Sequence, residues 1–138
     1  MKYKKNDGGK KKAFPKTPLR SGDCVIRAIT LATEKPYKEV WTEMFELAKV
    51  EGDFPNSERI SIMYLESLGW KETKLPYKPL VRINSPKLFH LTKSDKWVIF
   101  HIRHHWVACK ENTLHDIWDS RTNSVGDYSR VFRYYTLD

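Results

Sequence analysis

The sequence contains little that would anchor it in a membrane or stabilise it outside the cell. No run of apolar residues approaches the length of about 18 residues that a membrane-spanning helix requires. The lysines at the N-terminus are not followed by the apolar stretch of a secretory signal. Only two cysteines occur in 138 residues, and without an export signal we expect both to stay reduced. These absences predict a cytoplasmic protein with no membrane partner.

The positive charge is concentrated at one end of the chain. Residues 1–20 contain eight Lys or Arg and one acid, Asp7, so that residues 21–138 hold only +1 of the net charge of +8. This distribution predicts a basic, flexible arm over residues 1–20 and a single folded domain over residues 21–138. Such an arm attracts nucleic acid or an acidic partner weakly and in a salt-dependent way.

The first half of the domain has the apolar spacing of helices. The predicted helices cover residues 23–33, residues 37–50 and a segment that runs from the capping residue Ser57 to the stop at Gly69. The dipeptide Lys35-Pro36 ends the first helix, because the residue before a proline avoids the helical region. Residues 71–93 are mixed in character and are expected to be irregular.

From Trp97 onward the apolar period changes towards two, which indicates strands. The predicted strands cover residues 96–103, 105–110, 114–119 and 129–136, and the middle two form a hairpin around residues 111–113. Helices followed by antiparallel strands indicate an α+β domain, with the helices packed on one side of the sheet.

Cys24 is the first candidate for chemistry. Gly22 and Asp23 supply a turn and an N-cap, so the thiol lies on the first turn of a helix. Unpaired N–H groups and the positive end of the helix dipole favour the thiolate there, and the thiolate is the form that attacks a carbonyl carbon. The second cysteine, Cys109, lies between apolar strand residues and is expected in the core.

A nucleophilic cysteine needs a base, and the base needs a group that orients its ring. His105 opens the first strand of the predicted hairpin. Folding about Asn112 places Asp119 opposite His105, where it would bind the Nδ1–H. A shifted register would bring Asp116 to the imidazole instead. Asp119 is therefore the first choice and Asp116 the alternative.

The order of these residues resembles that of the papain-like cysteine peptidases. The similarity is greatest to the compact bacterial and phage forms related to the bacteriocin-processing (C39-like) peptidases. Residues 22–29 (GDCVIRAI) resemble the start of the central helix in small phage-encoded members, and residues 105–108 (HWVA) and 116–119 (DIWD) resemble their histidine and acidic strands. The resemblance implies a nucleophile at the start of a central helix that packs on a C-terminal antiparallel sheet.

The resemblance also assigns roles to individual residues. Cys24 would be the nucleophile, His105 the general base and acid, and Asp119 the orienting group. Papain-like enzymes place a glutamine shortly before the cysteine to line the oxyanion hole, and this chain contains no glutamine. The backbone N–H of Cys24 is then one oxyanion donor, with Ser21 or Thr17 as candidates for another.

These observations predict a cysteine-dependent hydrolase that cleaves an amide or isopeptide bond in a protein or peptide. The alternative is a papain-like fold with weak or no catalysis that serves as a phage or host interaction or inhibitor protein. Its basic arm would contact an acidic partner or nucleic acid. His101, His104 and His105 lie close together, but neighbouring strand residues face opposite ways and the cysteines are distant. No metal or other cofactor is therefore expected.

Overall fold

The structure, a computed structural model, describes residues 1–19, 22–121 and 129–137. Its helices are α1 (Lys10–Ala13), α2 (Cys24–Thr33), α3 (Tyr37–Glu51), α4 (Glu58–Ser67) and α5 (Phe89–Thr92), with a 3-10 turn over Pro86–Leu88. Its strands are β1 (Lys2–Lys5), β2 (Trp70–Lys74), β3 (Val98–Ile102), β4 (His105–Lys110), β5 (Thr113–Asp116) and β6 (Val131–Leu137). The strands form one sheet in the order β1-β5-β4-β3-β6-β2. The predicted α+β class is therefore confirmed.

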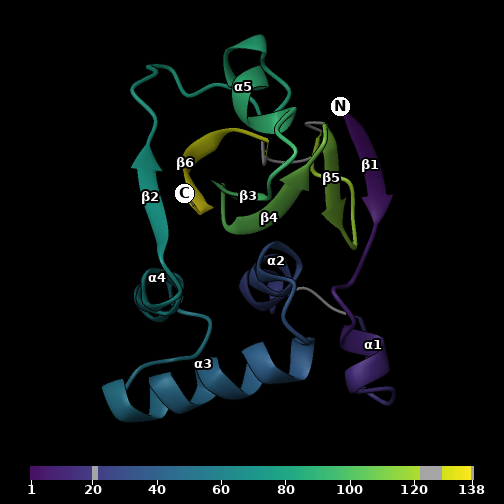
Figure 1. The fold of residues 1–138 in the computed structure, drawn as a ribbon, viewed down its shortest axis with the longest axis vertical. Helices are drawn as coiled ribbons and strands as arrows, with labels where there is room; N and C mark the ends of the chain where they lie inside the picture. The colour runs from purple at the N-terminus through teal and green to yellow at the C-terminus, as the bar shows by residue number, and fades with distance from the viewer. Residues whose placement is uncertain (20–21, 122–128, 138) are drawn as a thin grey trace.

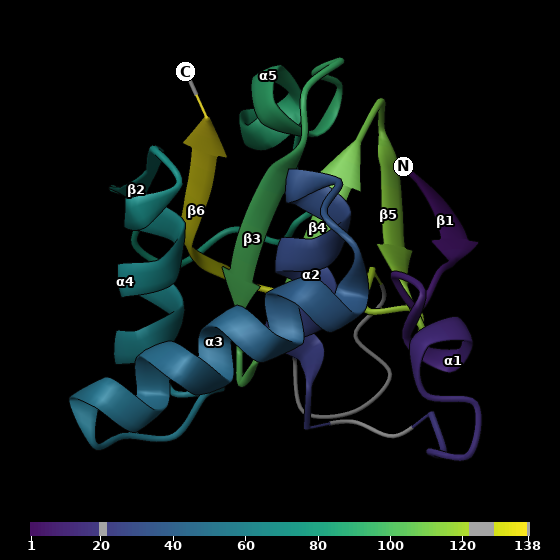
Figure 2. The same cartoon turned by 60° about the horizontal axis from the view of Figure 1, so that its bottom comes forward.

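The helix α2 lies at the centre of the molecule and packs chiefly on β4 (Figures 1 and 2). Its apolar side chains are buried against the inner face of the sheet and against α3 and α4; they are Val25, Ile26, Ala28, Ile29 and Ala32. The helix ends where Glu34 adopts a left-handed conformation, just before Lys35-Pro36. This packing fixes the N-terminal end of α2, and with it Cys24, beside the start of β4.

The three predicted helices are present. The stop of α3 is Gly52, whose φ of 68° is the left-handed conformation that glycine adopts most readily. The start of α4 is capped by Ser57, whose hydroxyl accepts the N–H of Ile60 at 3.2 Å. Local capping and apolar spacing therefore predict this half of the domain well. Within the described residues, no helix combines the length and the apolar character that crossing a bilayer requires.

The second face of the sheet is also covered, which the sequence did not indicate. The 3-10 turn and α5 bury Leu88 and Leu91 against Val98, Phe100 and Val107 on this face. The segment expected to be irregular also contains β2, which pairs with β6 at the edge of the sheet. The long helices do lie on one side, as predicted, but short elements pack on the other (Figure 1).

The hairpin of β4 and β5 differs from its prediction by one residue. Its loop contains two residues, Glu111 and Asn112, both with positive φ (51° and 57°), and Lys110 pairs with Thr113. Two successive left-handed residues make the tight turn whose twist matches that of a hairpin. Because the loop is shorter than the predicted one of three residues, β5 begins one residue earlier and ends at Asp116.

The N-terminal segment is part of the domain, so the prediction of a flexible arm over residues 1–20 is wrong where the structure describes it. The strand β1 pairs in parallel with β5, which makes the sheet only mostly antiparallel. Met1 and Tyr3 pack against the core of the second face, whereas Lys2 and Lys4 are exposed. The alternation of lysine with apolar residues is therefore that of an edge strand, with its charges in solvent.

Candidate active site

The candidate nucleophile Cys24 is the first residue of α2. Its side chain is partly buried and lines a cleft of about 420 Å³ together with His105, Trp106, Asn56 and Glu58. The cleft lies where the start of α2, the loop before α4 and the start of β4 meet. The thiol is thus accessible from solvent and in contact with titratable groups, as a reactive cysteine requires.

His105 provides the partner for this thiol. It is the first residue of β4 and only 4% exposed. Burial alone would raise the pKa of Cys24, but the hydrogen bond to His105 and its charge, with the backbone N–H of Trp106, hold that pKa below its usual value. Burial also opposes the charged form of His105, yet hydrogen bonds to Asp116 and Cys24 raise its pKa to about 9. Both shifts favour a thiolate beside an imidazolium.

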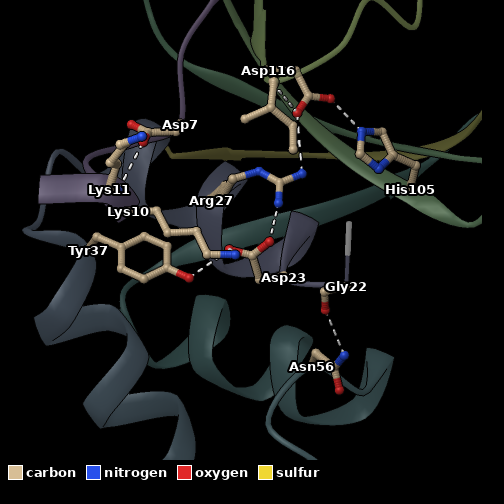
Figure 3. Close-up of polar contacts among 11 residues, drawn as sticks. Asp7, Lys10, Lys11, Gly22, Asp23, Arg27, Tyr37, Asn56, His105 and Asp116 are labelled. Atoms are coloured by element: carbon tan, nitrogen blue, oxygen red, sulfur yellow. Dashed lines mark hydrogen bonds and ion pairs between the residues drawn. The ribbon is translucent and has the colours of Figure 1, made fainter. Parts of the chain in front are cut away.

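Asp116 is the residue that holds the imidazole. One of its carboxylate oxygens is hydrogen-bonded to Nε2 of His105, and the other accepts the N–H of Ile117 at 2.7 Å (Figure 3). The prediction named Nδ1 as the bound nitrogen; because Nε2 is used, Nδ1 is the nitrogen left for the thiol. Trp118 packs on the imidazole with ring centroids 4.7 Å apart and shields it from water. The ring is therefore held on two sides.

The first choice for this role, Asp119, is wrong. Its carboxylate forms a two-pronged ion pair with Arg121, at 2.9 Å to Nε and 2.7 Å to Nη2, and this hydrogen bonding lowers the pKa of Asp119. The physical reason is the tight turn of the hairpin: its register, continued from the Lys110–Thr113 pair, puts Trp118 level with His105, and Asp119 lies beyond the end of β5 at Asp116. The alternative of the sequence analysis, Asp116, is the one the structure brings to His105.

A buried arginine forms an ion pair with the carboxylate of Asp116. Arg27, on α2, is 2% exposed and binds Asp116 at 3.4 Å and also Asp23 (Figure 3). Asp23 in turn forms an ion pair with Lys10 at 3.0 Å and accepts a hydrogen bond from the hydroxyl of Tyr37 at 2.6 Å. A buried cation of this kind is tolerated because two carboxylates surround it. The network connects α1 to the candidate triad.

Two parts of this network were missed in the sequence. Arg27 interrupts an otherwise apolar helix, and a charge in that position is a signal that it has a buried partner. Asp23 occupies the N-cap position, as predicted, but its side chain makes no capping hydrogen bond because it binds Arg27, Lys10 and Tyr37 instead. No local pattern connects Lys10 to either residue.

The candidate oxyanion donors have different outcomes. The backbone N–H of Cys24 lies in the first turn of α2, where no helical carbonyl is available to it. Thr17 is exposed and is not among the described residues that line the cleft. Ser21 lies outside the described residues. Among the described residues, the remaining candidates for the second oxyanion donor are the polar side chains that line the cleft.

The other histidines and the second cysteine do not join the triad. His101 and His104 line the cleft, but the described part of the chain contains no group of three His, Cys, Asp or Glu side chains that could hold a metal ion. His115 lies near Asn6, 3.3 Å from its amide nitrogen. Cys109 is fully buried on β4, and burial raises the pKa of its thiol to about 12.

Comparison with known proteins adds no assignment. The chain matches no protein-family model, no curated protein and no solved structure.

Proposed function

We propose that this protein is a cysteine-dependent hydrolase of amide or isopeptide bonds in protein or peptide substrates. The observation that carries the proposal is that Cys24, at the start of α2, and His105, at the start of β4, meet at one open cleft, with the buried Asp116 of β5 hydrogen-bonded to His105. Nucleophile, base and orienting group are the three parts that this chemistry requires. The resemblance to compact papain-like peptidases is consistent with the same chemistry, with Asp116 in place of Asp119.

The geometry supports a two-step reaction. The Cys24 thiolate attacks the carbonyl carbon, and as the C–N bond breaks the His105 imidazolium gives its proton to the leaving amine. This leaves a thioester on Cys24. The neutral imidazole then takes a proton from water, whose oxygen attacks the thioester and breaks the C–S bond. A carboxylic acid leaves, the thiolate is restored, and Asp116 stabilises the imidazolium in both steps.

The thiol chemistry can be tested without knowing the substrate. We expect iodoacetamide at pH 7 to alkylate Cys24 at least about 100-fold faster than Cys109, because only Cys24 is accessible and has a lowered pKa. Peptide mass spectrometry after timed labelling measures both rates in one sample. The variant His105→Ala is expected to slow labelling of Cys24 and to leave Cys109 unchanged.

The matched control is Cys109→Ala, which removes the second thiol and keeps the site. Its Cys24 should label at the wild-type rate. Slow labelling of both thiols in the native protein would rule out the hydrolase proposal, since the thiolate is its nucleophile.

A further inference from the structure

We infer that the side-chain amide of Asn56 is the second oxyanion donor, acting beside the backbone N–H of Cys24. The inference rests on the proposed hydrolase function and makes Asn56 a catalytic residue of the same site. It also accounts for a chain that contains no glutamine. The donor would come from the loop between α3 and α4, rather than from the segment that precedes the nucleophile.

The position of Asn56 is the first support. It lines the same cleft as Cys24 and His105. Its Nδ2 donates a hydrogen bond of 2.9 Å to the carbonyl oxygen of Gly22, two residues before the nucleophile (Figure 3). That acceptor settles which end of the amide is nitrogen, because an amide oxygen cannot donate. The nitrogen therefore lies next to the start of α2.

Donor capacity is the second support. A primary amide carries two N–H groups, and among the described residues Gly22 is the one acceptor that Nδ2 has. One N–H is thus left for a ligand in the cleft. Gly22 itself has a φ of +124°, a conformation that other residues rarely adopt, and this turn presents its carbonyl to Asn56.

The loop that carries Asn56 is held by its own hydrogen bonds. The Asp53 carboxylate accepts the N–H of Phe54 at 2.7 Å and the hydroxyl of Ser57 at 3.2 Å, and the N–H of Ser57 binds the carbonyl of Phe54 at 3.1 Å. Ser57 also caps α4. A donor that is positioned before the reaction stabilises developing charge without reorganisation, which is the requirement for an oxyanion hole.

The backbone N–H of Cys24 is also in position to donate, because it has no acceptor within α2. The first N–H of α2 that bonds within the helix is that of Arg27, to the carbonyl of Asp23 at 3.0 Å. The side chain of Asp23 is engaged elsewhere and does not cap the first turn. The N–H of Cys24 and the amide of Asn56 therefore both lie close to Gly22 at the N-terminal end of α2, where a substrate carbonyl attacked by the thiolate would develop its charge.

Two reactions of the same thiolate test this inference. Acylation by p-nitrophenyl acetate passes through a tetrahedral oxyanion, as the thiolate adds to the ester carbonyl and p-nitrophenolate leaves. Alkylation by iodoacetamide displaces iodide and forms no oxyanion. We expect Asn56→Leu and Asn56→Ala to slow acylation at least about tenfold and to change alkylation by less than about twofold. The exposed Asn84, outside the cleft, gives the matched control Asn84→Leu, which should alter neither rate.

Each outcome has a defined meaning once thermal unfolding shows that the variants fold. Slowed acylation with normal alkylation, partly restored by Asn56→Gln, supports the oxyanion role. Equal acylation in wild type and both Asn56 variants overturns it and leaves the hydrolase proposal intact. Slow alkylation of Cys24 in the wild type instead overturns the hydrolase proposal, and the inference falls with it.

Discussion

Cys24 and Cys109 are the same side chain in two regions of one domain, and their surroundings give them opposite properties. Cys24 lies at the open end of α2, beside a buried imidazole that lowers its pKa. Cys109 lies on the other face of the sheet among apolar side chains, where burial raises its pKa to about 12, and its thiol donates to the carbonyl of Thr92 at 3.6 Å. The reactivity that we expect of Cys24 therefore depends on a nearby histidine and on access to solvent. Residue type and secondary structure alone do not confer it.

The largest expected effect is on the rate of acylation of Cys24, and it comes from removing the negative charge of Asp116. We expect Asp116→Asn to slow acylation of Cys24 by about 10²- to 10⁴-fold, because the imidazole loses its orienting carboxylate. The rate is measured by p-nitrophenolate release in a single turnover. The matched variant Asp119→Asn weakens a half-buried pair with Arg121, away from His105, and should leave the rate within about twofold. An equal effect of both variants would contradict the assignment of Asp116.

The next effect is on the free energy of unfolding, and it compares Arg27 with Cys109, which lie on opposite faces of the sheet. Arg27→Met leaves Asp23 and Asp116 partly unpaired below the surface, and we expect the free energy of unfolding to fall by about 3–5 kcal/mol. Cys109→Ala removes one sulfur from an apolar core and should cost on the order of 1 kcal/mol. Urea unfolding of both variants at pH 7 measures the difference. A loss of less than about 1 kcal/mol for Arg27→Met would mean that the buried network contributes little.

The smallest effect is a difference in pH dependence. Since the pKa of Cys24 is lowered and that of His105 is raised to about 9, thiolate and imidazolium coexist between these two values. Alkylation of Cys24 should rise at a pH below the ordinary thiol range and stay high above pH 9. Hydrolysis of amides should decline above about pH 9, because the leaving amine then lacks its proton donor. Identical profiles for the two reactions above pH 9 would contradict the imidazolium as the acid.

Much of the fold follows from local patterns in the sequence. The spacing of apolar residues predicts α2, α3 and α4, and the chemistry of Ser57, Gly52 and Lys35-Pro36 predicts where they begin or end. These features are local because a helix forms its hydrogen bonds within four residues. The position of Cys24 on the first helical turn, and of His105 at the start of a strand, could be predicted for the same reason.

The strand register, the place of β1 and the partners of the site residues depend on contacts between segments that are distant in the sequence. A turn one residue shorter than predicted moved Asp119 out of register with His105, and β1 joined the sheet by pairing with a strand over 100 residues away. No local pattern indicates that the partner of Arg27 is Asp116, or that the partner of Asn56 is Gly22. The sequence alone therefore determined which groups were available for chemistry. Only the tertiary structure decided which of them meet, because contacts between distant segments depend on how the whole sheet and its helices pack.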